Sequence, residues 1–175
     1  MFTYAELVRA LWFILPAYIA NASPPLLRGR HPIDFKKKLK KARILGDGKT
    51  IEGAIGGIVF GCLCGLIQMY FFSDFQSFFG LTLIPPTYSV IFLLSSGAVV
   101  GDIAGSFLKR RFRIDRGRPA PLLDQLDFLV GALVFVSIVY KLSSVSILIL
   151  VIITPILHWL TNLFAYYSRI KDVPW

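Results

Sequence analysis

The amino-acid sequence predicts an all-α integral membrane protein, with about five transmembrane helices forming a single domain over residues 1–175. Hydrophobic residues make up 55% of the 175 residues, and the mean hydropathy of +0.67 lies above that of soluble domains. Long apolar runs recur along the chain, and a bilayer core about 30 Å thick needs helices of roughly 20 residues. Basic residues gather between alternate runs, as expected for loops on one face of a membrane.

The first apolar run is expected to stay in the membrane as a permanent span. A cleaved signal peptide begins with basic residues, whereas the charges here follow the run. The third run comes after Pro85 and Pro86, whose fixed backbone angles suit the start of a helix. The last two spans come from the apolar run after Asp127, divided near residues 141–144. The expected spans are 4–22, 52–72, 87–107, 126–140 and 145–167.

The distribution of lysine and arginine predicts the orientation. Nine of these residues lie between the first and second spans, six lie between the third and fourth, and two follow the fifth. In a five-span topology, 17 of the 19 therefore share one side, which the positive-inside rule makes cytoplasmic. We expect the amino terminus outside, the carboxyl terminus in the cytoplasm, and two basic cytoplasmic loops. The run "KKKLKK" at 36–41 is adequately explained by contact with anionic lipid.

The first basic loop ends in "RILGDGKTIEG", just before the second span. An arginine stands where a P-loop needs its first glycine, and no strand is expected before it, so a P-loop NTPase is excluded. Gly46 and Gly48 permit a tight turn, and Lys49 with the amide groups that open the next helix can face an anion. The simpler interpretation is a helix start capped by Asp47 or Thr50.

Aspartates near the second basic loop have the spacing of side chains that share one helix face. Asp102, Ser106 and Lys109 stand at i, i+4 and i+7, on one stripe that leads toward the cytoplasmic end of the third span. Asp124 and Asp127 stand at i and i+3. If the fourth helix begins just before this pair, all three carboxylates are expected to converge at the membrane boundary.

Converging carboxylates repel one another unless protons or cations lie between them. Mg²⁺ prefers oxygen ligands and commonly binds carboxylates together with substrate phosphates, so this set favours phosphoryl or nucleotidyl transfer. The simpler interpretation is that Asp124 caps a helix and Asp127 pairs with an arginine. No such explanation accounts for Asp102. Placing an acidic side chain inside a membrane span costs free energy, so its presence there indicates a functional role.

Other polar and small residues lie within the expected spans. His158 and Asn162 share one face of the fifth span, and Asn21 lies near the inner end of the first. These side chains either make interhelical hydrogen bonds or meet the carboxylates below the basic surface. Glycines on the second span predict close helix packing or, less simply, a groove for lipid chains; they are Gly53, Gly56, Gly57, Gly61 and Gly65.

Four motifs resemble the archaeal CDP-archaeol synthase family in order and over nearly the whole chain: "LGDGKTIEG", "GDIAGSFLKRR", "GRPAPLLDQLDF" and "PILHWLTNLFAYYSRIKDVPW". That family is more distantly similar to the bacterial phosphatidate cytidylyltransferases. Their His-Gly-Gly element is replaced by "RPAPLL", so no role of that histidine is expected here. The residues that fall in the order of the bacterial signature are Ser106, Lys109, Arg110, Asp115, Gly117, Asp124 and Asp127.

The resemblance implies a reaction of CTP with 2,3-bis-O-geranylgeranyl-sn-glycerol 1-phosphate, an isoprenoid ether-lipid phosphate, at the cytoplasmic face. Asp102, Asp124 and Asp127 would hold Mg²⁺ and, with Lys109, form the catalytic set. The lipid phosphate would attack the α-phosphorus of CTP and release pyrophosphate. No nucleic-acid partner is expected. The residues expected to bind CTP are Asn21, Gly46, Asp47, Gly48, Lys49, Thr50, Ser106, Arg110, Arg111, Asp115 and Gly117.

Three other functions fit part of the sequence. A cytidylyltransferase for diacyl phosphatidate would need the same polar residues. A non-catalytic protein that binds anionic lipid would explain the lysine run but not the aspartates. A transporter would explain His158 and Asn162 and would not consume CTP.

Overall fold

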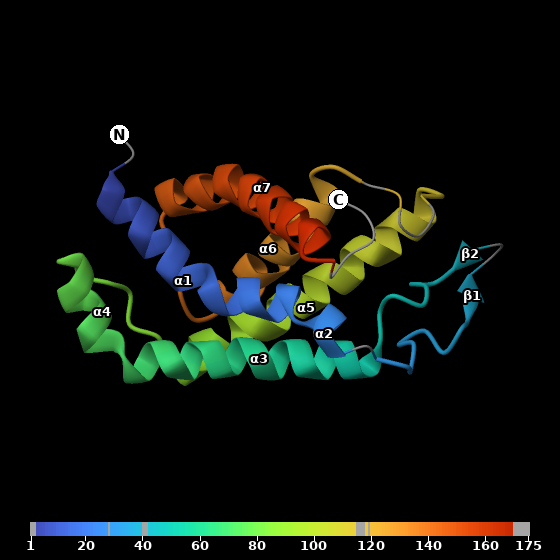
Figure 1. Ribbon diagram of the computed structural model, residues 1–175, viewed down its shortest axis with the longest axis horizontal. Helices are drawn as coiled ribbons and strands as arrows, with labels where there is room; N and C mark the ends of the chain where they lie inside the picture. The colour runs from blue at the N-terminus through green and yellow to red at the C-terminus, as the bar shows by residue number, and fades with distance from the viewer. Residues whose placement is uncertain (1–2, 28, 40–41, 115–117, 119, 170–175) are drawn as a thin grey trace.

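The computed structural model describes residues 3–27, 29–39, 42–114, 118 and 120–169. It confirms the all-α class, with one short pair of strands in the first basic loop (Figure 1). The elements are α1 (Tyr4–Ala22), α2 (Pro24–Leu27), β1 (Lys38–Leu39), β2 (Ala42–Arg43), α3 (Ile51–Tyr70), α4 (Phe72–Phe79), α5 (Tyr88–Arg111), α6 (Leu123–Val136) and α7 (Ser144–Tyr167).

Four helical segments in the described residues are long and apolar enough to cross a membrane. They are Tyr4–Leu27, Ile51–Tyr70, Tyr88–Arg111 and Ser144–Phe164, and they correspond to the first, second, third and fifth expected spans. The expected fourth span, 126–140, is α6, which has 14 residues. At a rise of 1.5 Å per residue, α6 is roughly 21 Å long, which is less than the hydrocarbon thickness of about 30 Å.

The four long helices each begin where the sequence supplies a hydroxyl cap. In each case the cap side chain accepts a hydrogen bond from a backbone N–H in the first turn. That N–H has no carbonyl partner within the helix, so the cap satisfies it. The capping residues are Thr3, Thr50, Thr87 and Ser143. Thr50 therefore fills the capping role that the sequence suggested for it.

Helix α5 packs against α6 through backbone contacts that only small residues permit. A Cβ atom at Gly97 would lie 2.6 Å from the carbonyl oxygen of Gly131, and one at Gly101 would lie 2.3 Å from that of Asp127. The pairing of the earlier residue of α5 with the later residue of α6 makes the helices antiparallel. This contact brings Asp127 beside the turn of α5 that carries Asp102.

Helix α3 packs against α1 along its glycines. A Cβ atom at Gly57 would lie 2.8 Å from the carbonyl oxygen of Ala20, and one at Gly61 would lie 2.7 Å from that of Pro16. The opposite side of α3 is exposed and apolar, for example at Ile55. The prediction of close packing at these glycines is confirmed, and the exposed side of α3 is suited to lipid.

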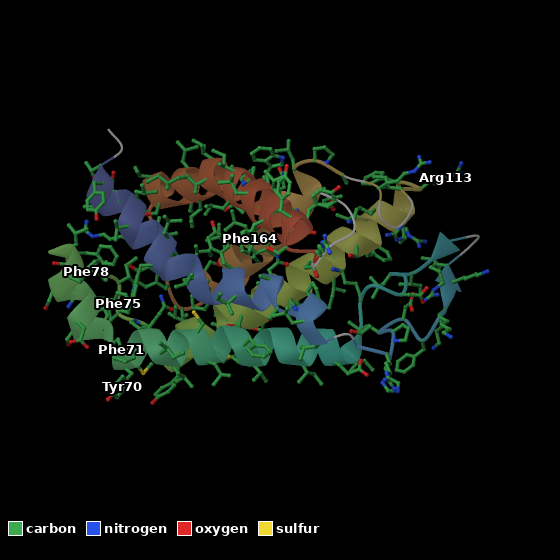
Figure 2. The ribbon with its side chains drawn as sticks, viewed as in Figure 1. Tyr70, Phe71, Phe75, Phe78, Arg113 and Phe164 are labelled. Carbon is green, nitrogen blue, oxygen red and sulfur yellow. The ribbon has the colours of Figure 1, made fainter. Side chains whose placement is uncertain are left out.

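The two ends of the bundle differ in chemistry. Aromatic side chains gather where α3 meets α4, and Figure 2 shows Tyr70, Phe71, Phe75 and Phe78 together at that end. Figure 2 places Arg113 at the far end of α5, on the opposite side of the molecule. The long axis in Figure 1 therefore runs from an aromatic end to an end that carries basic residues of α5.

The first basic loop folds into an antiparallel hairpin with Lys38 opposite Arg43 and Leu39 opposite Ala42. We call its described residues, 34–39 and 42–46, the basic hairpin. The Asp34 side chain lies at its centre, fully buried, and accepts hydrogen bonds from the Arg43 guanidinium at 2.8 and 3.1 Å. The sequence did not predict this hairpin.

Candidate active site

A polar cavity of about 490 Å³ lies where several helices meet near the basic end of α5. Its walls come from the end of α1, the start of α3, the second half of α5, the start of α6 and one face of α7. The sequence-predicted residues that line it are Asn21, Asp47, Gly48, Lys49, Thr50, Asp102, Lys109, Asp124, Asp127, His158 and Asn162. The structure therefore brings most of the predicted polar residues together in one place.

Two of the three aspartates form ion pairs with lysines from other segments. The Lys49 Nζ atom lies 2.5 Å from Asp102 Oδ2, which joins the loop before α3 to the middle of α5. The Lys109 Nζ atom lies 2.5 Å from Asp124 Oδ1, which joins the end of α5 to the start of α6. These four side chains are 18% to 26% exposed, so each pair is partly withdrawn from water. Asp124 also accepts a hydrogen bond from the Ala120 N–H at 2.9 Å, and Leu122 occupies the N-cap position of α6.

Asp127 has a different environment. Its Oδ1 accepts a hydrogen bond from the Phe128 N–H at 2.6 Å, and its carboxylate lies against Gly105. A Cβ atom at Gly105 would lie 2.1 Å from Asp127 Oδ2, so the glycine makes room for the carboxylate. Within the part of the chain that the structure describes, Asp127 forms no ion pair. The pairing of Asp127 with an arginine, which the sequence suggested as a simpler interpretation, is therefore not found among these residues.

The carboxylates do not form a ready-made cage for a metal ion. Among the described residues, no three His, Cys, Asp or Glu side chains are grouped closely enough to hold one. The donors nevertheless have the right chemistry, because Mg²⁺ takes carboxylate oxygens and usually needs only one or two of them when substrate phosphates and water complete its shell. Asp102, Asp124 and Asp127 all line the same cavity and therefore fit an ion that binds together with a polyphosphate.

The turn before α3 forms one rim of the cavity. Gly46 has a φ of 97°, a left-handed conformation that favours glycine, and Gly48 lines the cavity two residues later. Thr50 caps α3 by accepting from the Gly53 N–H at 3.1 Å. Asp47 pairs with Arg43 at 2.9 Å while it also lines the cavity. The α3 amino terminus therefore faces the cavity with its backbone amides and Lys49.

Several predicted residues lie outside the cavity lining. Arg110 donates to the carbonyl oxygens of Leu45 at 3.2 Å and Ile114 at 2.5 Å, and Arg111 donates to that of Arg43 at 2.8 Å. These two arginines tie the basic hairpin to α5, and their contact with a triphosphate stays a prediction. Gly46 does not line the cavity, and Ser106 is buried within α5. Asp115 and Gly117 lie outside the described residues.

Helix α7 contributes two side chains to the cavity. The amide nitrogen of Asn162 lies 3.2 Å from Nδ1 of His158, so the pair makes a hydrogen bond within one helix face. Both residues line the same cavity as the carboxylates, and Asn21 lines it from α1. These polar groups therefore share the cavity with the carboxylates, and their role there stays a prediction.

Asp34 is the structural residue that sequence reasoning missed. Besides Arg43, it binds the backbone N–H groups of Leu45 and Gly46, each at 3.1 Å, and so shapes the loop that leads to Lys49. The Arg43 guanidinium holds the pKa of the Asp34 carboxyl well below its usual range, more than offsetting burial, which acts in the opposite direction. The available signal was a lone acidic residue inside a strongly basic run.

Replacing Asp34 with asparagine is expected to loosen the basic hairpin. A hydrogen bond to a charged group contributes about 1.5 to 3 kcal/mol, so we expect the Leu45 and Gly46 amides to exchange with solvent on the order of tenfold faster or more. The depressed pKa means that the contribution of Asp34 is complete at neutral pH and declines as pH falls below about 4. Hydrogen exchange followed by mass spectrometry measures both effects.

The matched control is Asp47→Asn. Asp47 also pairs with Arg43 but is 54% exposed, and exposed ion pairs contribute little. Equal exchange rates in Asp34→Asn and the unchanged protein would contradict the role given to Asp34.

Residues 3–175 match the family described as "CarS-like: CDP-archaeol synthase". The chain belongs to the CDP-archaeol synthase family. The CDP-archaeol synthase of Pyrococcus horikoshii is 45% identical over 171 residues, which cover 97% of this chain and 98% of that one. The CDP-archaeol synthase of Thermococcus gammatolerans is 49% identical over 167 residues, with 95% of each chain covered.

A further relative agrees with this chain in length, and a solved structure agrees with it in fold. The protein from Methanocaldococcus jannaschii is 47% identical over 177 residues and covers 98% of this chain and 99% of its own. A solved structure described as "Structural insight into an intramembrane enzyme for archaeal membrane lipids biosynthesis" superposes with a TM-score of 0.77 at 37% identity, covering 90% of this chain and 94% of that one. The family resemblance of the four motifs is confirmed, and the chain is a multi-pass membrane protein.

Proposed function

We propose that this chain transfers CMP from CTP to the phosphate of 2,3-bis-O-geranylgeranyl-sn-glycerol 1-phosphate, forming unsaturated CDP-archaeol and pyrophosphate. One observation carries the assignment to a site. Three aspartates and two lysines from separate segments face one cavity at the basic end of the membrane helices. Membership of the CDP-archaeol synthase family supports the class of reaction.

The reaction needs charge neutralisation and alignment more than proton transfer. An oxygen of the lipid phosphate forms a bond to the α-phosphorus of CTP, and the bond from that phosphorus to the β-phosphate bridging oxygen breaks. The electron pair leaves with pyrophosphate. A phosphomonoester is already anionic near neutral pH, so no general base has to remove a proton. Holding two anions in line is therefore the main task of the protein.

Lys49 and Lys109 are the groups that meet the incoming negative charge. Each ammonium lies 2.5 Å from an aspartate, and a triphosphate in the cavity would compete for both. As the lysines turn to phosphate oxygens, they free carboxylate oxygens of Asp102 and Asp124. The backbone amides at the start of α3 add a favourable dipole for the same anion.

The carboxylates released in this way would hold Mg²⁺ together with Asp127. Such an ion neutralises phosphate charge and aligns attacking and leaving oxygens. A set of one or two carboxylates plus substrate phosphates is the usual one for Mg²⁺, which supports an ion that enters with the nucleotide.

The proposed topology has five crossings, with α6 as a short fourth crossing and the amino terminus outside. The basic loops then face the cytoplasm, where CTP is available, and the isoprenoid chains of the acceptor remain in the hydrocarbon. The concentration of 17 of the 19 basic residues on one side supports this arrangement.

The direct test is synthesis of the CDP-lipid by the purified protein. With labelled CTP, Mg²⁺ and the geranylgeranylated glycerol phosphate, we expect labelled CDP-lipid and one pyrophosphate per product. Omission of the lipid or removal of Mg²⁺ with EDTA should abolish both. The same assay with diacyl phosphatidate tests the choice of acceptor. No product with either lipid would refute the proposed function, and a lipid-binding protein or transporter would then be the better description.

A further inference from the structure

The basic hairpin presents lysines and apolar side chains together on its surface. Lys36, Lys37 and Lys38 are all exposed, and Phe35 and Leu39 are 70% and 47% exposed. In Figure 1 the strands of this hairpin project past the start of α3, at the end of the molecule opposite α4. Within the described residues of the hairpin, the Phe35 ring makes no ring contact, so this exposed face is suited to an external partner.

The hairpin is held rigidly. The buried Asp34 carboxylate accepts bonds from the Arg43 guanidinium and from the N–H groups of Lys36, Leu45 and Gly46. Arg111 donates to the carbonyl oxygens of Leu39 and Arg43, at opposite strands of the hairpin. The lysines and Phe35 therefore stand on a fixed scaffold attached to α5.

The turn of the hairpin holds the exposed Phe35 in a strained backbone conformation. Phe35 and Lys36 have φ values of 46° and 62°, a left-handed conformation that is unfavourable for residues other than glycine. Such conformations persist where the surrounding structure enforces them, and they concentrate at functional positions. Here the enforcing contacts are the hydrogen bonds to Asp34.

The chain before the hairpin fixes it beside the membrane-spanning part. His31 and Ile33 bond to the chain that opens α3, through the Ile51 N–H to the His31 carbonyl and the Ile33 N–H to the Lys49 carbonyl, each at 2.9 Å. The hairpin begins with the next residue, so it starts at the end of a transmembrane helix. Since α3 is long and apolar enough to cross a membrane, the hairpin lies beside the point where that helix would leave the bilayer.

We propose that the basic hairpin binds anionic lipid headgroups of the leaflet on which the polar cavity opens. Lys36, Lys37 and Lys38 pair with lipid phosphates, and Phe35 and Leu39 enter the headgroup region. Lysine beside exposed apolar residues is the combination that favours an anionic membrane surface, and each cation near such a surface strengthens binding by about fivefold.

A consequence for catalysis rests on the proposed function. The acceptor lipid is a phosphomonoester and carries more negative charge than a typical phosphodiester lipid. A hairpin that attracts anionic headgroups would raise the local concentration of acceptor beside the cavity. The chemistry of the site itself would be unaffected, because these lysines do not line the cavity.

The test is the depth of a spin label at position 35, introduced as Phe35→Cys in a Cys62→Ala, Cys64→Ala background. In nanodiscs that contain phosphatidylglycerol, we expect the label to become more accessible to oxygen and less accessible to a water-soluble nickel complex. The shift should disappear in phosphatidylcholine nanodiscs and in the Lys36→Glu, Lys37→Glu, Lys38→Glu variant. The Lys141→Glu variant is the control for charge reversal away from the hairpin.

A label that stays in water in every nanodisc would overturn the proposal and point to a soluble acidic partner instead. A label that enters all nanodiscs equally, with no effect of the charge reversals, would also overturn it. This measurement contains neither CTP nor acceptor lipid, so its result does not depend on whether the proposed reaction occurs. In the enzymatic assay, the variant with all three lysines replaced should have a KM for acceptor lipid about tenfold higher or more. Its KM for CTP and its kcat should be unchanged. An unchanged KM for the lipid would refute the consequence for catalysis.

Discussion

Replacing Asp102 with asparagine is expected to lower the rate of CDP-archaeol formation by about 100- to 1,000-fold. Asp102 lies 2.5 Å from Lys49 and lines the cavity with Asp124 and Asp127. The amide keeps the size of the carboxylate but removes its charge, so it binds neither a lysine nor a divalent ion well. Losses of this size are typical when one charged or polar group that stabilises a transition state is removed. Initial rates with labelled CTP measure the effect.

The matched control is Asp74→Asn. Asp74 is exposed on α4, at the far end of the molecule, and undergoes the same chemical change. Its variant should retain the full rate. Thermal unfolding of both variants separates loss of chemistry from loss of structure. A folded Asp102→Asn protein with an unchanged rate would remove Asp102 from the site.

Replacing Gly131 with alanine is expected to reduce both stability and activity. A Cβ atom there would lie 2.3 Å from the Gly97 carbonyl oxygen and 2.6 Å from the Gly101 Cα atom. Both are backbone atoms, so α5 and α6 must separate to admit the methyl group. Overpacking of this kind costs about 1 to 3 kcal/mol. Because Asp102 and Asp127 lie on the two separated helices, we also expect a large fall in kcat.

Val134→Ala is the control on the same helix. Val134 is 59% exposed, so shortening it leaves the contact between α5 and α6 intact. Melting temperatures and initial rates of the two variants, measured in the same detergent, give the comparison. If the Gly131→Ala variant has the same melting temperature and the same initial rate as the unchanged protein, the close helix contact does not position the carboxylates.

Apolar runs and capping residues account for the parts of the fold that the sequence predicted well. The start of the third span was expected at residue 87, and Thr87 is the N-cap of α5. The end of α6 was harder to predict, because residues 137–140 continue the apolar run without a proline or glycine. Hydropathy does not distinguish a helical turn from a tight apolar bend there. The helix ends at Val136.

Part of the candidate site could be predicted, because a charged side chain inside a membrane span costs free energy and is therefore rarely present without a function. Asp102 stood out because it lies inside a span, and the spacing of Asp124 and Asp127 placed them on one helix face. The lysine partners were not predictable, since Lys49 and Lys109 reach aspartates 53 and 15 residues away in sequence. The bonds of Arg110 and Arg111 to the hairpin were not predictable either, because they depend on helix α5 continuing to Arg111 and carrying both arginines beside that loop.

The pairing of Lys49 with Asp102 and of Lys109 with Asp124 means that the protein supplies its own counter-ions. Mutual neutralisation lets this polar pocket remain assembled at the edge of the hydrocarbon without help from a divalent cation. Chelators should therefore stop turnover while leaving the melting temperature unchanged, and added Mg²⁺ should restore activity at once. Under the proposed mechanism, the polar site would be assembled before Mg²⁺ arrives, and the ion would be needed for turnover alone.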